Sequence, residues 1–401
     1  MPINSPSYLF VSNYFPPPFV GGSVVYNHFL HLAFGPETLV LAPAHSAAQH
    51  HDSSLPYAVL RLACALPTDA VASRWRRMFN GLTLFFKVLW LVKKLNIKVL
   101  HVGNLGKLGL TAAIVARLTG VKTVITIHGE ELTTRPGRGA LWWGWPGRGI
   151  NALLYCCARR LDLVIVPSPT TQKILINMGF KPQHIAVITP GVDETKLPDI
   201  ESLPKVMPEI PNSGPLIVCV GRLISRKGQD ILLQAMPRVL DIYPKAHLVL
   251  AGSGPDENKL RLLMHRLGLA PCVSLLTQVS NPQVAWLYAH CSLFCMPNRT
   301  LSNGDSEGYG IVFLEAGAWG KPVIGGRAGG AVDAVDDGVT GLLVDSEDPN
   351  AVADGILHLL SQPDLGRRMG DAGRLKALSN AWQGKSEQFK ILVEQLGHTK
   401  G

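Results

Sequence analysis

The sequence predicts an α/β protein made of two Rossmann-like domains, each built on a doubly wound parallel sheet. Its 401 residues exceed the length that one hydrophobic core usually supports. Apolar residues make up 47% of the chain and charged residues only 17%, with 40 glycines and 29 prolines, a composition typical of enzymes with buried parallel strands. Short apolar runs also alternate with longer helical patterns through both halves, which is the order that βαβ units produce.

Five apolar runs in the first half are predicted to be strands, because each is short and is followed by a turn or a helical pattern. They are Tyr8–Ser12, Glu37–Ala42, Val99–Val102, Val121–Ile127 and Leu163–Pro167. The helical patterns between them include Val24–Phe34, Thr111–Gly120 and Ile150–Arg160. Right-handed connections through such helices place the strands in one parallel sheet.

The second half repeats this alternation after a polar, proline-rich stretch at residues 199–215, which can continue neither a helix nor a central strand. We therefore predict domains at 1–198 and 216–378, with 199–215 as the linker. Residues 379–401 are predicted to form a C-terminal helix that packs back on the first domain. Ligands bind at the carboxyl ends of such strands, so two facing domains would form an interdomain cleft. The predicted strands are Leu216–Val220, Ala246–Ala251, Val273–Leu276, Leu293–Met296, Pro322–Ile324 and Gly341–Val344.

The formal charge of +9 favours anionic partners, a description that nucleic acid, anionic lipid and nucleotide diphosphates all satisfy. We expect no nucleic acid partner, because the chain has no RNA-binding signature and no basic region with heptads. The seven scattered cysteines lack paired CxxC spacing, so we expect no metal site and a reducing compartment. The N-terminus lacks a secretory pattern, and the apolar run Leu82–Val92 is too short to cross a bilayer. A cytoplasmic protein is expected.

The segment EGYGIVFLE, Glu307–Glu315, follows a predicted strand and a polar loop and leads into an apolar helix. Gly308 and Gly310 let the backbone approach a ligand closely, and the amide groups of a helix start bind anions such as a diphosphate. Glu307 is expected on the loop and Glu315 about one turn inside the helix, where carboxylates would accept hydrogen bonds from sugar or ribose hydroxyls. The alternative is a helix-start acid and a solvated glutamate, which leaves the glycines unexplained.

The segment GRLISRKG, Gly221–Gly228, lies at the end of the first strand of the second domain. Arg222 and Lys227, five residues apart, could bracket two phosphates and neutralise a leaving diphosphate without a metal. The alternative is a solvated basic loop. No role is assigned to Arg226.

The segment AGSGP, Ala251–Pro255, lacks the third glycine of a dinucleotide fingerprint and is expected near a nucleotide base.

These two segments resemble the E-x7-E motif and the G-R-L-x-x-x-K-G pattern of the GT-B glycosyltransferases grouped as family four. The resemblance covers most of the chain and implies a GT-B fold, with an acceptor-side first domain and a second domain that binds a nucleotide sugar. It implies that Glu315 binds the ribose and that Glu307 contacts the donor sugar. It also implies that the amides around Gly310, Ile311 and Val312 hold the diphosphate, together with Arg222 and Lys227.

Two further segments of the first domain match family positions. Gly21 and Gly22 follow the first strand, where the family has a Gly-Gly pair near the donor phosphate and the acceptor. His128 lies just past a strand end, where a comparable His-Gly of the family lies beside the donor sugar. The alternatives are a plain tight turn for the glycines and, for His128, a core histidine bonded to the backbone.

The resemblance implies a retaining hexosyltransferase that uses a nucleotide-diphosphate sugar and needs no cofactor or metal. The run from Asn298 to Gly308 is similar to a subset that includes GDP-mannose-dependent mannosyltransferases, which favours GDP-mannose over a UDP-sugar. The acceptor is expected to be a lipid-linked molecule or a saccharide. A sugar-nucleotide epimerase and a catalytically silent GT-B scaffold are the alternatives. The basic and aromatic stretch 74–94 either touches an anionic membrane at its inner face or is a core-facing helix with a solvated basic edge.

Overall fold

The computed structural model divides the chain into two compact units. The first contains Met1–Thr189 and Trp382–Gly401, and the second contains Pro190–Ala381. The residues that the structure describes are 6–17, 21–62, 74–129, 132, 154–193, 197, 203, 207, 210 and 214–398, without the side chains of 74–79.

The first unit is built on a seven-stranded parallel sheet in the order β3-β2-β1-β4-β5-β6-β7. The strands predicted in this half are all present, because their apolar runs are long enough to be buried on both faces of the sheet. The edge strands β3 and β7 are additional to the prediction. The bounds are β1 (Tyr8–Val11), β2 (Thr38–Pro43), β3 (Ala58–Leu62), β4 (Val99–Val102), β5 (Lys122–Thr126), β6 (Leu163–Val166) and β7 (Ile185–Val187).

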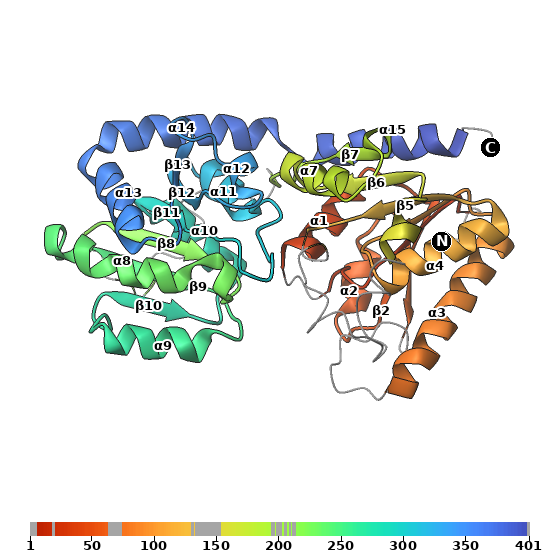
Figure 1. Ribbon diagram of the computed structural model, residues 1–401, viewed down its shortest axis with the longest axis horizontal. Helices are drawn as coiled ribbons and strands as arrows, with labels where there is room; N and C mark the ends of the chain where they lie inside the picture. Colours follow the sequence, from red (N-terminus) through yellow and green to blue (C-terminus); the bar gives the residue numbers. More distant parts are fainter. Residues whose placement is uncertain are drawn as a thin grey trace. The chain divides into compact units, whose positions relative to one another are not determined.

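Helices lie on both faces of this sheet (Figure 1). They are α1 (Gly22–Leu30), α2 (Ala48–Ser53), α3 (Arg74–Lys94), α4 (Lys107–Thr119), α7 (Pro169–Asn177) and α15 (Trp382–His398), with a 3-10 turn at Pro182–His184. Of the helix predicted at Ile150–Arg160, residues 154–160 are described: 154–158 are helical, and 159–160 form a turn.

The last helix, α15, packs on the end of α1. The Ser386 hydroxyl donates to the Leu30 carbonyl over 2.9 Å and accepts from the Ala33 amide over 2.7 Å. The Trp382 ring stacks on Phe29 with a centroid distance of 5.3 Å. These contacts make the C-terminal helix part of the core of the first unit.

A hydrogen-bonded polar network lies inside the first unit. The Tyr8 hydroxyl lies 3.0 Å from Nε2 of His31 and 2.6 Å from Nδ1 of His101. His31 Nδ1 is 2.6 Å from the Asn27 carbonyl, and His101 Nε2 is 2.8 Å from the Thr126 hydroxyl. The Tyr8 hydroxyl and all four ring nitrogens of this network have partners when each imidazole carries a single proton. This assignment of the protons is inferred from the bonding pattern. Burial lowers the pKa of His31 to about 3 and the pKa of His101 well below its usual value.

The second unit has a six-stranded parallel sheet in the order β10-β9-β8-β11-β12-β13. All of its strands match predicted apolar runs. The chain leaves β8 toward β10 and then returns to β11 on the other side of β8, so the order reverses between β8 and β11. In open α/β sheets such a reversal is where ligands bind. The bounds are β8 (Leu216–Val220), β9 (His247–Ala251), β10 (Val273–Leu276), β11 (Leu293–Met296), β12 (Val323–Gly326) and β13 (Gly341–Val344).

The helices of the second unit are α8 (Gln229–Ile242), α9 (Glu257–Arg266), α10 (Asn281–His290), α11 (Ile311–Ala318), α12 (Ala331–Ala334), α13 (Pro349–Ser361) and α14 (Pro363–Ser379). Most of the predicted linker 199–215 lies outside the described residues. Its described apolar members Leu203, Met207 and Ile210 are buried in the core of the second unit.

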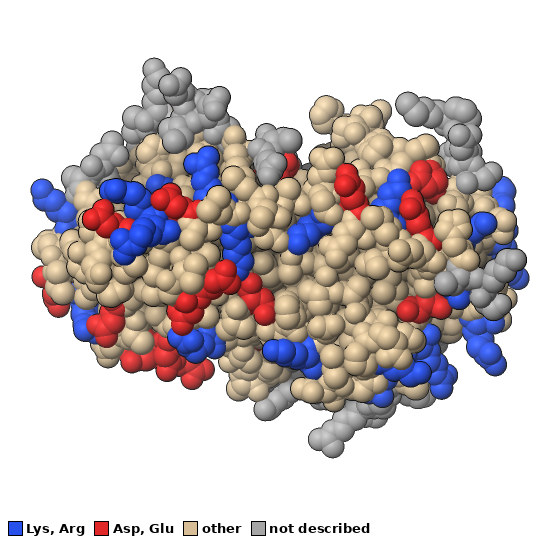
Figure 2. Space-filling model, turned by 90° about the horizontal axis from the view of Figure 1, so that it is seen from above, with Lys and Arg blue, Asp and Glu red and all other residues tan. Residues whose placement is uncertain are grey.

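The surface carries charges of both signs. On the face drawn in Figure 2, basic and acidic side chains are interspersed, so the excess of positive charge does not gather there into one patch. Among the helices of the described residues, none has both the length and the apolar character that crossing a bilayer requires.

Candidate active site

The loop that follows β8 holds three basic residues in different environments. Arg222 is exposed, while Arg226 and Lys227 in the 3-10 turn Ser225–Lys227 are 5% and 8% exposed. Gly228 ends this loop in a left-handed conformation, and a Cβ there would lie 1.9 Å from the Pro297 carbonyl oxygen. The backbone therefore turns sharply at Gly228, where only a glycine fits beside Pro297.

The loop before α11 carries the second predicted segment. Gly310 has a φ of 92° and caps the helix, so the amides of Ile311 and Val312 begin α11 without acceptors inside it. The Gly330 amide donates to the Glu307 carbonyl over 2.7 Å, which ties this loop to the one after β12. The amide groups and the positive end of the helix dipole make this helix start suited to an anion.

Glu307 is held by two cations that meet at one carboxylate oxygen. Both Lys227 Nζ and Arg226 Nη1 lie 2.6 Å from its Oε2, and Arg226 Nε lies 3.5 Å from Asp305 Oδ1. We call Arg226, Lys227, Asp305 and Glu307 the four-charge cluster. Burial alone would raise the pKa of Glu307, but the neighbouring charges of Lys227 and Arg226 outweigh it and lower the pKa to about 2. Glu307 is therefore ionised at neutral pH.

Glu315 lies in a different environment, inside α11. Its Oε2 accepts a hydrogen bond of 2.8 Å from the Tyr288 hydroxyl of α10, which is itself buried. Burial raises the pKa of Glu315, while the Tyr288 hydrogen bond and the charge of Lys227 act in the opposite direction. The two carboxylates thus differ in partner and in pKa, which is consistent with separate roles.

The structure brings only some of the predicted residues into contact. Lys227 and Glu307 form an ion pair, whereas Arg222 has no ion-pair partner among the described residues. Arg226, Asp305 and Tyr288 were not predicted for the site. Arg226 adjoins Lys227 in the sequence, and this adjacency was the only signal for it.

Gly252 and Gly254 of the AGSGP segment pack against the backbone of Gly221 and Leu223, so close backbone packing accounts for both glycines.

Gly21, Gly22 and His128 lie in the first unit. Gly21 has a φ of 88° and caps α1, which begins at Gly22, while the preceding Phe19 and Val20 lie outside the described residues. His128 follows β5 and is 7% exposed. Its Nε2 lies 3.2 Å from the Gly103 carbonyl oxygen, and its ring meets the Tyr26 ring edge-on at 5.5 Å. A backbone partner therefore holds this imidazole at the carboxyl end of the sheet.

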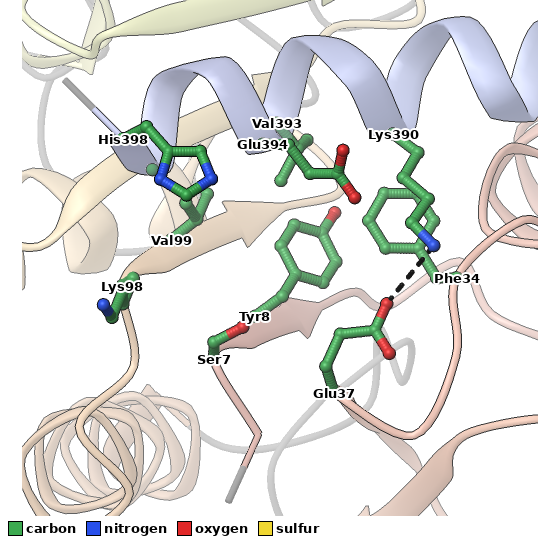
Figure 3. A pocket seen from close by; sticks show the side chains of 11 residues that line it. Ser7, Tyr8, Phe34, Glu37, Lys98, Val99, Lys390, Val393, Glu394 and His398 are labelled. Carbon is green, nitrogen blue, oxygen red and sulfur yellow. Dashed lines mark ion pairs between the residues drawn. The ribbon is translucent and has the colours of Figure 1, made fainter.

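A pocket of about 270 Å³ lies elsewhere on the first unit, beneath α15 (Figure 3). Tyr8 and Val99, the first residues of β1 and β4, line it, so it lies at the amino ends of the strands. Lys390 and Glu37 form an ion pair of 3.6 Å at its rim. Ligands of such sheets bind at the opposite edge, so we interpret this pocket as a gap in the packing of α15 on the sheet.

Within the described residues, no three His, Cys, Asp or Glu side chains are grouped in a way that could hold a metal ion.

Comparison with known families finds matches in both halves of the chain. The model described as "Glycosyl transferases group 1" matches residues 205–376, and "Glycosyltransferase Family 4" matches residues 32–196. The chain is 30% identical over 393 residues to a "GDP-mannose-dependent alpha-(1-6)-phosphatidylinositol monomannoside mannosyltransferase" of Mycolicibacterium smegmatis, covering 96% of each chain. A "GDP-mannose-dependent monoacylated alpha-(1-6)-phosphatidylinositol monomannoside mannosyltransferase" of Corynebacterium glutamicum is 31% identical over 399 residues, covering 96% of this chain and 97% of the relative.

Solved structures share the fold at lower identity. A sucrose-phosphate synthase from Thermosynechococcus elongatus superposes with a TM-score of 0.78 at 21% identity, over 97% of this chain and 98% of the other. HepE from Anabaena, solved in complex with UDP, also gives a TM-score of 0.78, at 20% identity and over 97% and 100% of the two chains.

Proposed function

Because this chain belongs to the GT-B glycosyltransferases with group 1 and family 4 domains, we propose that it transfers a mannosyl group from GDP-mannose to a lipid-linked acceptor with retention of configuration. The observation that carries the proposal is the Lys227–Glu307 pair together with the open start of α11, at the reversal point of a parallel sheet. A cation, a carboxylate and free amides at this point suit a sugar attached to a diphosphate.

In the proposed donor site, the amides of Ile311 and Val312 bind the diphosphate. Arg222 and Lys227 neutralise its charge, since Arg222 is exposed and an ammonium on the flexible stem of Lys227 can turn toward phosphate oxygens. Glu315 accepts hydrogen bonds from the ribose, with Tyr288 orienting its carboxylate. Glu307 accepts a hydrogen bond from a hydroxyl of the donor sugar, with Gly308 and Gly310 leaving room beside it.

In the proposed reaction, the bond between the anomeric carbon and the diphosphate oxygen breaks while the acceptor oxygen bonds to the same face of that carbon. The departing phosphate oxygen takes the acceptor proton. Lys227, Arg222 and the helix amides stabilise the charge that develops on the leaving group. A route through an enzyme nucleophile would need a free carboxylate beside the anomeric carbon. Glu307 is a poor candidate for it, because two cations already bind one of its oxygens.

For the first unit we propose that Gly21 and Gly22 allow the donor phosphate and the acceptor to approach the backbone. We propose that His128 forms a hydrogen bond with a hydroxyl of the donor sugar, while the contact of its Nε2 with the Gly103 carbonyl oxygen fixes the orientation of the imidazole.

The donor and acceptor are proposed from the relatives. Those of Mycolicibacterium smegmatis and Corynebacterium glutamicum are named as GDP-mannose-dependent and as acting on phosphatidylinositol monomannosides. We therefore propose GDP-mannose over UDP-sugars and a mannosylated phosphatidylinositol as the acceptor class. An epimerase and a silent scaffold are less favoured, because the full-length relatives are named as transferases.

Incubation of the purified protein with GDP-mannose and a phosphatidylinositol monomannoside is expected to yield a dimannoside whose new linkage keeps the donor configuration. Mass spectrometry would identify the product, and the one-bond C1–H1 coupling would report its anomeric configuration. An inverted linkage would contradict retention. An altered free sugar nucleotide formed without acceptor would instead indicate an epimerase. Failure of GDP and UDP alike to raise the melting temperature would indicate a silent scaffold.

We also propose that the outer face of α3 contacts an anionic membrane. The inner face of this helix packs into the core through Leu84 and Val88. Outward, Leu82, Phe86 and Trp90 recur every fourth residue and are 48%, 61% and 48% exposed. The ammonium groups of two lysines lie over the Trp90 ring, at 4.7 Å for Lys87 and 4.5 Å for Lys94.

The helix α3 contains no acidic residue, and its sequence begins with three arginines among its first four positions and ends with two lysines. Exposed aromatic side chains beside lysines can enter the interface of a bilayer while the ammonium groups meet anionic headgroups. The two interpretations of this helix are therefore compatible, because one face packs into the core and the opposite face is proposed to contact the membrane.

The double variant Phe86→Ser/Trp90→Ser is expected to bind vesicles at least about tenfold more weakly, since two aromatic side chains no longer leave water. Co-sedimentation with vesicles containing about 30% phosphatidylglycerol would measure this, and wild-type binding should weaken as salt is added. The matched control is Leu262→Ser, which removes an apolar side chain that is 67% exposed on α9 of the other unit. Equal binding by all three proteins would refute the membrane face.

A further inference from the structure

Lys227 is paired with a carboxylate. Its ammonium lies 2.6 Å from the Glu307 carboxylate, and both residues are largely buried. If Lys227 neutralises the donor diphosphate, as the proposed function on which this inference rests requires, the ammonium has to turn from Glu307 toward a phosphate. Without another partner, Glu307 would then remain as an unpaired charge in a partly buried site, which is unfavourable.

We propose that Arg226 is a positioning residue that keeps Glu307 paired and so releases Lys227 for the diphosphate. Its Nη1 lies 2.6 Å from the same Glu307 oxygen that Lys227 contacts, and its Nε lies 3.5 Å from Asp305. Two carboxylates thus flank one guanidinium. Such a planar group with several fixed donors holds carboxylates in a set geometry.

The backbone also holds Arg226 in place. Its carbonyl accepts the Arg299 amide over 2.8 Å, and the Arg299 side chain pairs with Asp230 of α8 at 2.8 Å. Arg226 is only 5% exposed. Lys227, in contrast, has a compact ammonium on a flexible stem, which can change partners by rotation of its side chain. The geometry therefore assigns the fixed part to Arg226 and the moving part to Lys227.

Direct binding of the diphosphate by Arg226 is the alternative. Asp305 and Glu307 oppose it, because these two carboxylates would repel an anion that approached the guanidinium from their sides. The four-charge cluster holds two positive and two negative groups, so it offers no net charge to an anion. Only a change of partner by Lys227 makes one of these charges available.

A double-mutant cycle on GDP binding separates the two roles. GDP is the suitable probe because it carries the diphosphate but lacks the sugar that Glu307 is proposed to contact. Isothermal titration calorimetry would give the Kd of wild type, Arg226→Met, Glu307→Gln and the double variant. Arg226→Met is expected to weaken GDP binding by about tenfold, since Lys227 then remains with Glu307. Glu307→Gln is expected to leave binding unchanged or tighter.

The decisive result is the effect of Arg226→Met in the Glu307→Gln background, where we expect less than about a twofold change because the rival carboxylate is gone. An equal loss in both backgrounds would show direct contact with the diphosphate, and no loss in either would show no role; both results overturn the inference alone. If wild type binds neither GDP nor UDP, the proposed function fails as well. Arg226→Lys, which keeps the charge, should restore part of the affinity, and Arg226→Gln takes the place of Arg226→Met in the cycle if the latter does not fold.

Discussion

Replacing Lys227 with alanine is expected to lower turnover by about two to three orders of magnitude, the usual effect of removing one group that stabilises a developing negative charge. The Lys227 ammonium lies 2.6 Å from Glu307, which belongs to the loop that leads into α11. Its loss would leave the departing diphosphate with Arg222 and the helix amides only. The kcat for mannosyl transfer from GDP-mannose would measure the effect.

The fold is expected to withstand this change, because Arg226 still pairs with Glu307 at 2.6 Å and no buried carboxylate loses its last partner. A melting temperature close to that of wild type would establish this. The matched control is Lys259→Ala on α9, which removes an exposed lysine of the same unit and should keep full turnover. Turnover of Lys227→Ala within a few fold of wild type would remove Lys227 from the mechanism.

The first unit is expected to lose stability steeply as the pH falls below about 6.5, because burial lowers the pKa of His31 from its usual 6.5 to about 3. Between these values the unfolded chain binds a proton at His31 and the folded unit does not. The free energy of unfolding therefore falls as the pH decreases, by about 1.4 kcal/mol per pH unit. Above about pH 6.5 both states are neutral at this residue and the dependence disappears.

His101, whose pKa burial also lowers, adds to this slope. Hydrogen exchange of β1 and β4 peptides between about pH 7.5 and pH 4.5, corrected for the intrinsic exchange rate, would report the local stability of this unit. His31→Gln is expected to flatten the slope by about 1.4 kcal/mol per pH unit. The exposed His265→Gln on α9 of the second unit should leave it as in wild type. A slope unaffected by His31→Gln would refute the neutral buried histidine.

The central strands were predictable because their signal is local. A strand such as β8, with the sequence LIVCV, is apolar throughout and almost fully buried, so the run itself shows where it lies. The edge strands carry no such signal. β3 is half-buried along its whole length and includes Arg61, and β7 has only three residues, so their pairing depends on the neighbouring strands.

The same distinction holds for the site. The loop-and-helix position of Glu307 and Glu315 followed from a contiguous segment. The role proposed for Arg226 did not, because its partner Glu307 lies 81 positions away along the chain. Tyr288 is likewise 27 positions from Glu315. An ion pair between distant residues leaves no periodic pattern in a single sequence, and only the folded sheet brings the two loops together.

The attachment of α15 to the first unit has a consequence for biosynthesis. Residues 190–381 form one continuous stretch, so the second unit is complete as soon as that stretch has left the ribosome. The core of the first unit cannot be completed before α15 has been synthesised, because Phe389 of this helix is fully buried and its ring meets that of His101 at 5.2 Å. Although most of the first unit precedes it in the chain, the second unit is the first whose residues are all available for folding. Until α15 has been synthesised, the face of α1 on which the Trp382 ring stacks stays uncovered.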